Sequence, residues 1–300
     1  MTTLKNRREE LTKNKIDKVN SNTILHTQTK RKSIREGLNT PLSDFIVNPR
    51  AEPMEDSNKE QLKPLYDFLC DQNNQELKKK VVEFEKGSLM QNPPRLDLCK
   101  QGSGKTNLDR LLKALEADSF RKDPFVEHLL LGNNMCGNRL GDEVGKFIRS
   151  GKSKLKTWYI AGNDLDADGI KPVCEALYED TQVKQLWLKR NPIRAEGAKE
   201  LSKMLSKNKT LEVLDLTNTA LFDEGVEELF STIPDNLKYL YLGANGLTSK
   251  SCEIIGKKIN NTNIRHLSLG CNRLTDEGAK FIGEFLKDPK CQLEVLELSS

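Results

Sequence analysis

The segment of this sequence that most resembles a chemical site is glycine-rich and runs from Cys99 to Thr106. It reads CKQGSGKT and lies between an apolar stretch, residues 96–98, and leucines with helical spacing that begin at Leu108. A strand, a glycine-rich loop ending in Gly-Lys-Thr and a helix are what a phosphate-binding loop requires, because the backbone N–H groups of the loop hold the phosphates. That loop also needs a glycine at its first position, where this chain has Cys99. We therefore interpret the segment as the glycine-rich turn of a degenerate repeat.

Other residues with catalytic or metal-binding potential do not form a recognisable set. The three histidines, His26, His128 and His266, are far apart, which disfavours a metal triad or a nucleophile–base pair. The seven cysteines show no CxxC spacing and are typical of reduced thiols. The sequence therefore predicts no catalytic residue, no cofactor and no metal, and we do not expect an enzyme.

A tandem repeat sets the elements of the chain. The phrase LxxLxLxxNxL restarts every 26 to 29 residues, at Val126, Leu155, Val183, Leu211, Leu237, Ile264 and Leu293. Its LxL core predicts a short strand with alternate side chains inward, and its asparagine can cap the backbone of the following turn. The asparagines are Asn134, Asn163, Asn191, Asn245 and Asn272, and one unit carries Thr219 instead. A fixed period of this size predicts a solenoid.

Each unit also contains a predicted helix with one apolar face. A small residue is followed by apolar residues four positions apart, as in Gly169, Val173 and Leu177 or Gly278, Ile282 and Leu286. One strand and one helix cannot bury an apolar face alone, so the units must stack. We expect parallel strands on the concave side of an arc and helices on the convex side.

These features resemble the ribonuclease-inhibitor-like class of leucine-rich repeats, whose units of about 28 residues carry a full helix. The resemblance covers residues 124–300, as six full units and a truncated seventh that begins at Leu293. It implies an α/β horseshoe and a binding surface. The seventh unit reaches Ser300 before its helix, so we expect either a fragment of a longer array or a strand edge covered by another molecule.

The chain before the repeats divides into two predicted parts. Residues 1–40 hold ten Lys or Arg and four Asp or Glu with few large apolar residues, so residues 1–56 are expected to be a disordered basic arm. The cluster around Ser33 fits a solvated tail, a nuclear-localisation or anionic-surface patch, or a phosphorylation target; without interleaved aromatic residues it gives little support to nucleic-acid binding.

Residues 57–123 are expected to be a helical N-terminal cap with a degenerate repeat. A capping box, Ser57 to Glu60, predicts a first helix, and Leu77, Val81 and Phe84 share one face of a predicted second helix. These helices are interpreted as the polar end cap of the solenoid, with docking to a partner's groove as the alternative.

Candidate functional residues alternate with the core leucines of the strands and therefore face the concave side. Three of the five tyrosines and one of the two tryptophans lie there. Aromatic side chains on a rigid exposed sheet are typical of binding anchors, although rings can also stack across strands to stabilise a sheet. The predicted binding residues are His128, Tyr159, Gln185, Trp187, Lys189, Arg190, Asp215, Tyr239, Tyr241, His266 and Glu297.

The composition, 36% hydrophobic and 31% charged, fits a surface-rich solenoid, and no apolar run is long enough for a membrane span or a signal peptide. We predict a non-enzymatic protein-interaction scaffold in the cytoplasm, with the nucleus as an alternative, that binds a protein partner on its concave face. Two alternatives rest on resemblance alone. Ran GTPase-activating proteins use the same type of repeat, and tropomodulin-like actin-capping proteins place an arm with amphipathic helices before a leucine-rich domain.

Overall fold

The computed structural model describes residues 49–299, apart from residues 75, 76, 78 and 105. These residues belong to a compact unit, Ile46–Ser300. Most of the predicted basic arm, residues 1–48, lies outside the described part of the chain. The remainder of that arm, residues 49–56, lies against the repeats, as described below.

A sheet of ten short strands runs through the unit in sequence order. Its last eight strands are parallel and pair in one constant register, so that residues at equivalent repeat positions face each other. They are β3 (Arg95–Asp97), β4 (His128–Leu130), β5 (Thr157–Tyr159), β6 (Gln185–Trp187), β7 (Val213–Asp215), β8 (Tyr239–Tyr241), β9 (His266–Ser268) and β10 (Val295–Glu297). The strand positions predicted from the repeat are confirmed.

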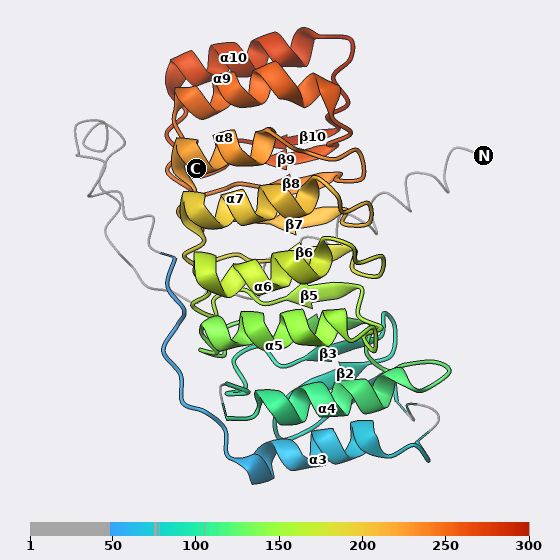
Figure 1. Ribbon diagram of the computed structural model, residues 1–300. Coiled ribbons are helices and arrows are strands. Elements are labelled where there is room, and N and C mark those ends of the chain that lie inside the picture. The colour runs from blue at the N-terminus through green and yellow to red at the C-terminus, as the bar shows by residue number, and fades with distance from the viewer. Residues whose placement is uncertain (1–48, 75–76, 78, 105, 300) are drawn as a thin grey trace, which may run out of the picture. The chain divides into compact units, whose positions relative to one another are not determined.

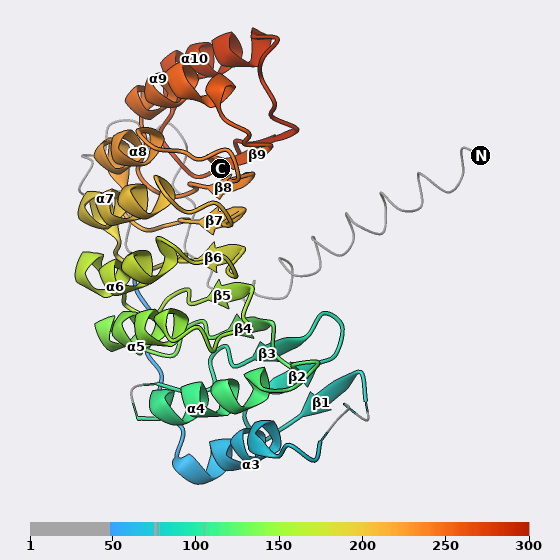
Figure 2. The ribbon, with the colours of Figure 1, turned by 45° about the vertical axis from the view of Figure 1, so that its right-hand side comes forward.

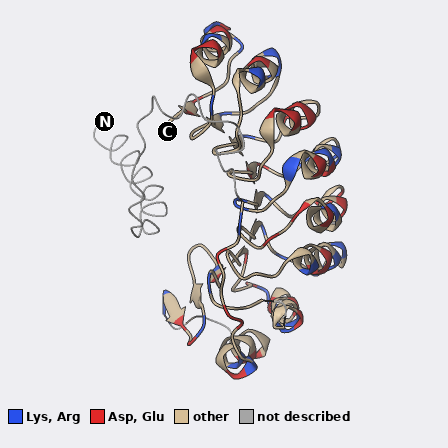
Figure 3. Ribbon diagram, turned by 90° about the vertical axis from the view of Figure 1, so that its left-hand side faces the viewer, with Lys and Arg blue, Asp and Glu red and all other residues tan. Residues whose placement is uncertain are grey.

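A helix follows each of the parallel strands from β3 to β9. The helices are α4 (Leu108–Ser119), α5 (Asn138–Arg149), α6 (Ala167–Leu177), α7 (Arg194–Leu205), α8 (Phe222–Phe230), α9 (Ser249–Lys258) and α10 (Thr275–Lys287). They form the outer layer of an arc whose inner layer is the sheet (Figures 1 and 2). Basic and acidic residues are spread together over the helical layer (Figure 3). The chain is therefore an α/β solenoid, as predicted.

The core lies between the two layers. The central side chain of each strand from β3 to β9 is completely buried, including Trp158, which replaces a leucine. The small helix residues allow close packing, because a Cβ on Gly141 of α5 would collide with the backbone carbonyl of Gly169 in α6. The prediction that Leu286, near the end of α10, lies in the core is wrong, because this residue is 46% exposed.

Buried asparagines connect the units after each strand, in what we call the asparagine ladder. The side-chain oxygen of Asn191 accepts hydrogen bonds from the backbone N–H of Asn163 (2.9 Å) and Leu165 (3.1 Å) in the preceding unit. Its amide group donates to the carbonyls of Ile160 (3.0 Å) and Leu188 (2.8 Å). One side chain thus satisfies four backbone groups that water cannot reach.

Thr219 stands in the ladder where the other units have asparagine. Its hydroxyl donates to the carbonyl of Leu216 in its own unit (2.7 Å), and its backbone N–H donates to the side chain of Asn245 (2.9 Å). Threonine has no amide group with which to reach back to a carbonyl of the preceding unit, so it replaces only part of what asparagine does.

The N-terminal end of the unit differs from the expectation of two helices. Helix α3 (Lys59–Cys70) is present, but its capping box is formed by Asn58 and Gln61 rather than by Ser57 and Glu60. The second predicted helix is wrong, because Val81–Glu83 (β1) and Ser88–Met90 (β2) form an antiparallel hairpin that continues into β3.

Pairing with the sheet and a tight turn explain the hairpin. Gly87, with a φ of 86°, provides the left-handed turn residue between the two strands. The alternate residues Val82 and Phe84 then pack against the core, and the Phe84 ring lies 5.5 Å from that of Phe68. The helical face predicted from the sequence instead contains Val81, which is 37% exposed in the hairpin, because pairing with the edge of the sheet turns Val82 toward the core.

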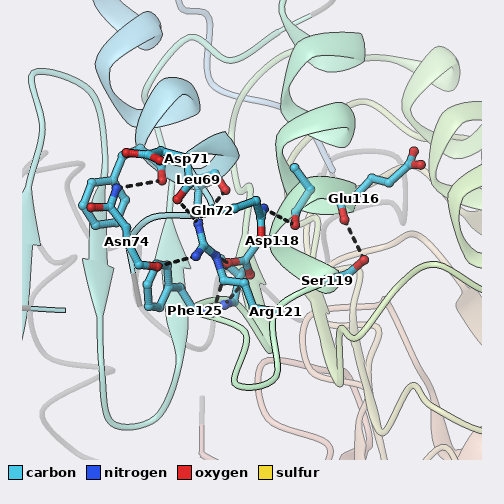
Figure 4. Close-up of polar contacts among 12 residues, drawn as sticks. Leu69, Asp71, Gln72, Asn74, Glu116, Asp118, Ser119, Arg121 and Phe125 are labelled. Atoms are coloured by element: carbon cyan, nitrogen blue, oxygen red, sulfur yellow. Dashed lines mark hydrogen bonds and ion pairs between the residues drawn. The ribbon is translucent and has the colours of Figure 1, made fainter. Parts of the chain in front are cut away.

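A buried arginine joins this end to the first repeat (Figure 4). Arg121 is paired with Asp118 at 3.0 Å, and the two side chains are 5% and 2% exposed. The guanidinium also donates to the carbonyls of Leu69 (3.1 Å) and Asp71 (2.7 Å) at the C-terminus of α3, and to that of Asn74. The positive charge thus meets the negative end of the α3 dipole.

Removing one rung of the asparagine ladder should destabilise the whole solenoid. Asn191→Ala leaves two buried N–H groups and the Leu188 carbonyl without the bonds it supplies, whereas the Ile160 carbonyl keeps its bond from Asn163 (3.1 Å). We therefore expect a loss of about 3 kcal/mol in the free energy of unfolding. Urea denaturation followed by circular dichroism measures it. Asn261→Ala, at an exposed position, is the control and should change stability by less than about 0.5 kcal/mol. Equal effects of the two substitutions would contradict the role of the ladder.

Removal of the buried arginine should loosen the N-terminal end. Arg121→Ala leaves Asp118 buried without its partner, which costs about 3–5 kcal/mol. The exposed ion pair between Lys63 and Asp67 offers a control, since Lys63→Ala should cost less than about 1 kcal/mol. Thermal unfolding of both variants tests the difference, and a shift of similar size in both would refute it.

Candidate protein-binding site

The glycine-rich segment is the connection between β3 and α4, and it contacts another part of the same chain. A Cβ on Gly102 would collide with the backbone N–H of Ser57, and one on Gly104 with the carboxylate of Asp56. Burial raises the pKa of the Cys99 thiol to about 12, so this thiol stays protonated at neutral pH. The glycines thus leave room for an acidic segment of the chain. Its negative charge would repel a phosphate, which binds where positive groups surround it.

We call residues 49–57 the strap. The strap runs from α3 along the loops that follow the strands and reaches the β6–α7 loop (Figure 1, blue). At its end, the backbone N–H of Ser57 donates to the carbonyl of Gly102 (2.8 Å) and its hydroxyl to that of Gln101 (2.6 Å). The strap therefore contacts the loops that follow β3 and β6.

Glu52 fastens the middle of the strap. Its carboxylate lies 2.5 Å from Lys100 and 3.0 Å from Arg190, at equivalent positions of units three repeats apart. Arg190 also donates to the backbone carbonyl of Arg50 (3.1 Å). The hydrogen bonds from Lys100 and then Arg190 lower the pKa of the Glu52 carboxyl. Arg190, predicted as a binding residue, is thus engaged with the strap.

A row of rings lies on the concave side, and we call Tyr159, Trp187, Tyr241 and His266 the aromatic row. The centroid distances along it are 6.1 Å from Tyr159 to Trp187, 5.7 Å from Trp187 to Tyr241 and 4.9 Å from Tyr241 to His266. All four side chains are half-buried. Burial raises the pKa of Tyr159 and of Tyr241 to about 12, so both phenols are neutral at physiological pH.

Asp215 lies beneath the aromatic row. It stands on β7 in register between Trp187 on β6 and Tyr241 on β8, whose rings stack at an interplanar angle of 27°. Since the aspartate is short, the two rings meet across it and leave it 4% exposed. Its carboxylate accepts from the backbone N–H of Thr217 at 2.8 Å. Burial raises the pKa of the Asp215 carboxyl, although hydrogen bonds from Thr217 oppose the rise.

The other predicted residues surround this row. The side-chain oxygen of Gln185 accepts from the Trp187 indole (3.3 Å), and Glu297 lies 3.3 Å from His266 Nε2. Tyr239 is 38% exposed with its ring 6.2 Å from that of His266. His128 lies further along the sheet, 2.8 Å from the Thr157 hydroxyl, and burial lowers the pKa of its imidazole. Lys189 is exposed beside the row.

The sequence reasoning found the aromatic residues but missed two features of the site. The strap was assigned to a disordered arm, although Gly102 and Gly104 were a signal that some backbone approaches this loop. Trp187 and Tyr241 stack on each other although the strand that carries Asp215 lies between theirs. The repeat spacing does not predict which rings stack.

The described residues, 49–299 with their gaps, offer neither a metal-binding cluster nor a membrane-spanning helix. No cluster of three or more His, Cys, Asp or Glu side chains is arranged to hold a metal ion among these residues. No helix in the same part of the chain has the length and apolar character needed to cross a membrane.

Acid should release the strap. The folded-state pKa of Glu52 is lowered, so its contribution to docking is present above its ordinary value of 4.5 and is lost as the pH falls through the folded value. At neutral pH, Glu52→Gln should reduce the amide-exchange protection of the strap by up to about fivefold, the range of exposed ion pairs. Glu55→Gln, on the same strap, is the control. Equal protection in both variants would show that the ion pairs do not hold the strap.

Comparisons with known proteins agree with the repeat architecture. A family model described as leucine rich repeat matches residues 151–174, 207–230 and 260–283. No curated protein matches the chain.

Solved structures similar to this one include the actin-binding site 2 of leiomodin-1, with 17% identity over 60% of this chain and 87% of that chain, and a TM-score of 0.38. The complex of Rad7 and Elc1 in yeast has 18% identity over 63% of this chain and 52% of that chain, and a TM-score of 0.39. The family matches fall on strand–helix units described above, and the chain contains leucine-rich repeats.

Proposed function

We propose that this chain is a protein-interaction module, rather than an enzyme, and that its concave face binds a protein partner. The observation that carries the proposal is the continuous aromatic row on an open sheet. Half-buried tyrosine and tryptophan rings held on a rigid surface lose little conformational entropy on binding, and such residues dominate the binding energy of protein interfaces.

The surroundings of the row also favour a macromolecular partner. Small-molecule sites are enclosed clefts. The aromatic row lies instead on an open sheet, and the hollows between α9 and α10 and beside Phe120 do not include it. The helix of nine to thirteen residues in each unit supports the ribonuclease-inhibitor-like class proposed from the sequence.

The competing explanation is that the rings only stabilise the sheet. Cross-strand ring pairs contribute about 0.2–1 kcal/mol each, so a purely structural row would affect stability and leave binding unchanged. The two explanations therefore differ in which measurement responds to removal of a ring.

Loss of the central rings should abolish partner capture. In affinity capture from cell extract, the Trp187→Ala, Tyr241→Ala variant should lose a partner that the intact chain retains, and each single substitution should weaken the measured Kd at least about tenfold. Phe120→Ala removes a ring that is 71% exposed on the helical side and serves as the matched control.

Two results would contradict the proposal: retention of the partner by the double variant, or its loss together with a collapse of the melting temperature. A captured small GTPase would be tested for faster GTP hydrolysis and captured actin for co-sedimentation, which examines the two alternatives drawn from the sequence.

A further inference from the structure

The carboxyl group of Asp215 is buried and has no ion-pair partner among the described residues, although the positive charge of Lys189 favours its ionised form. Among the described residues, none of the Lys, Arg or His nitrogens lies within ion-pair distance of it. Its hydrogen bonds come from Thr217, which is neutral. A desolvated carboxylate normally requires a cation or a larger set of donors, so this arrangement is costly for the isolated chain.

The bond to Thr217 explains the local turn but not the burial. Asp97 holds the equivalent position of β3 and makes the same bond, to the backbone N–H of Cys99 at 3.0 Å. Asp97 remains half-exposed, because its neighbours on the sheet place no stacked rings across it. Two aspartates thus perform the same local task, and only Asp215 is enclosed between aromatic faces.

The enclosing groups are those that bind a planar cation. Ring faces attract a guanidinium through their quadrupoles, and a carboxylate pairs with its N–H groups. The Asp215 carboxylate retains acceptor capacity beyond its bonds to Thr217. A lysine ammonium would satisfy the charge, whereas a flat guanidinium can also stack against the face of each ring once the two rings separate.

We propose that Trp187, Asp215 and Tyr241 form a closed site for an arginine side chain presented by the protein partner. On binding, the two rings part, the guanidinium enters between them, and its N–H groups donate to the carboxylate below. Side-chain rotations of this kind are common at interfaces. This inference rests on the proposed function, because it names the residue type by which the concave face recognises its partner.

A short peptide tests the site directly. The probe is an acetylated and amidated tripeptide of glycine, arginine and glycine, and its neutral counterpart carries citrulline in place of arginine. Trp187 reports binding through its emission, while Trp158 is completely buried. We expect saturable binding of the arginine peptide, with at least tenfold weaker binding of the citrulline peptide.

Three substitutions complete the test. Asp215→Asn keeps the acceptor for the Thr217 N–H and should weaken binding of the arginine peptide at least tenfold without lowering the melting temperature. Asp97→Asn, the matched control, should leave binding unchanged. Lys189→Ala should tighten binding, because this exposed lysine lies two residues after Trp187 and repels an arriving cation.

Equal binding of the arginine and citrulline peptides, or full binding by Asp215→Asn, would overturn the inference. Its failure is distinguishable from failure of the proposed function. If Asp215→Asn retains a partner that the Trp187→Ala, Tyr241→Ala variant loses, the concave face binds the partner but the arginine site is refuted. If the double variant retains the partner while Asp215→Asn loses the peptide, the arginine site stands and the proposed function fails.

Discussion

An amide side chain at the same place in each unit lets parallel strands stack without leaving their turns unsatisfied. Asn191 alone supplies partners to two N–H groups and two carbonyls from its own unit and the preceding one. Together with the backbone bonds between the strands, these bonds hold neighbouring units at a constant spacing and register. Equivalent residues come to lie in straight rows across the sheet, and a side chain on β6 acquires a definite relation to one on β8.

The same rows create the surface proposed to bind a partner. Core positions face the helices, so the alternate positions of every strand are free to differ without disturbing the stack. This freedom explains how Tyr159, Trp187 and Tyr241 are tolerated in a fold that depends on strict repetition elsewhere. The strap adds a different constraint, since it joins the loops at Lys100 and Arg190 through Glu52. These loops are thereby held together at the edge of the face that carries the aromatic row.

The sequence predicts the repeated part of the molecule well and the rest poorly, for physical reasons. The strands β4 to β10 follow from one period, and the role of asparagine follows from its capacity both to donate and to accept hydrogen bonds. The hairpin of β1 and β2 does not follow from that period, because Val81 and Phe84 have helical spacing in sequence while the pairing of β2 with β3 extends the sheet at its end. The position of the strap and the rings that enclose Asp215 depend on contacts between segments far apart in sequence. The spacing of residues along the chain does not predict such contacts.

Departures from the repeat are concentrated in one unit. The unit that starts at Leu211 has Thr219 in place of the ladder asparagine, the shortest of the repeat helices described, α8 with nine residues, and the enclosed Asp215. Thr219 lacks the amide group of asparagine, and the buried carboxyl of Asp215 lacks an ion-pair partner among the described residues. Both features reduce stability. Natural sequences violate such local rules mainly where function requires it. The coincidence of these costs in the unit whose Asp215 lies between Trp187 and Tyr241 supports the proposal that this unit, rather than the ends of the arc, is the centre of the surface that binds a partner.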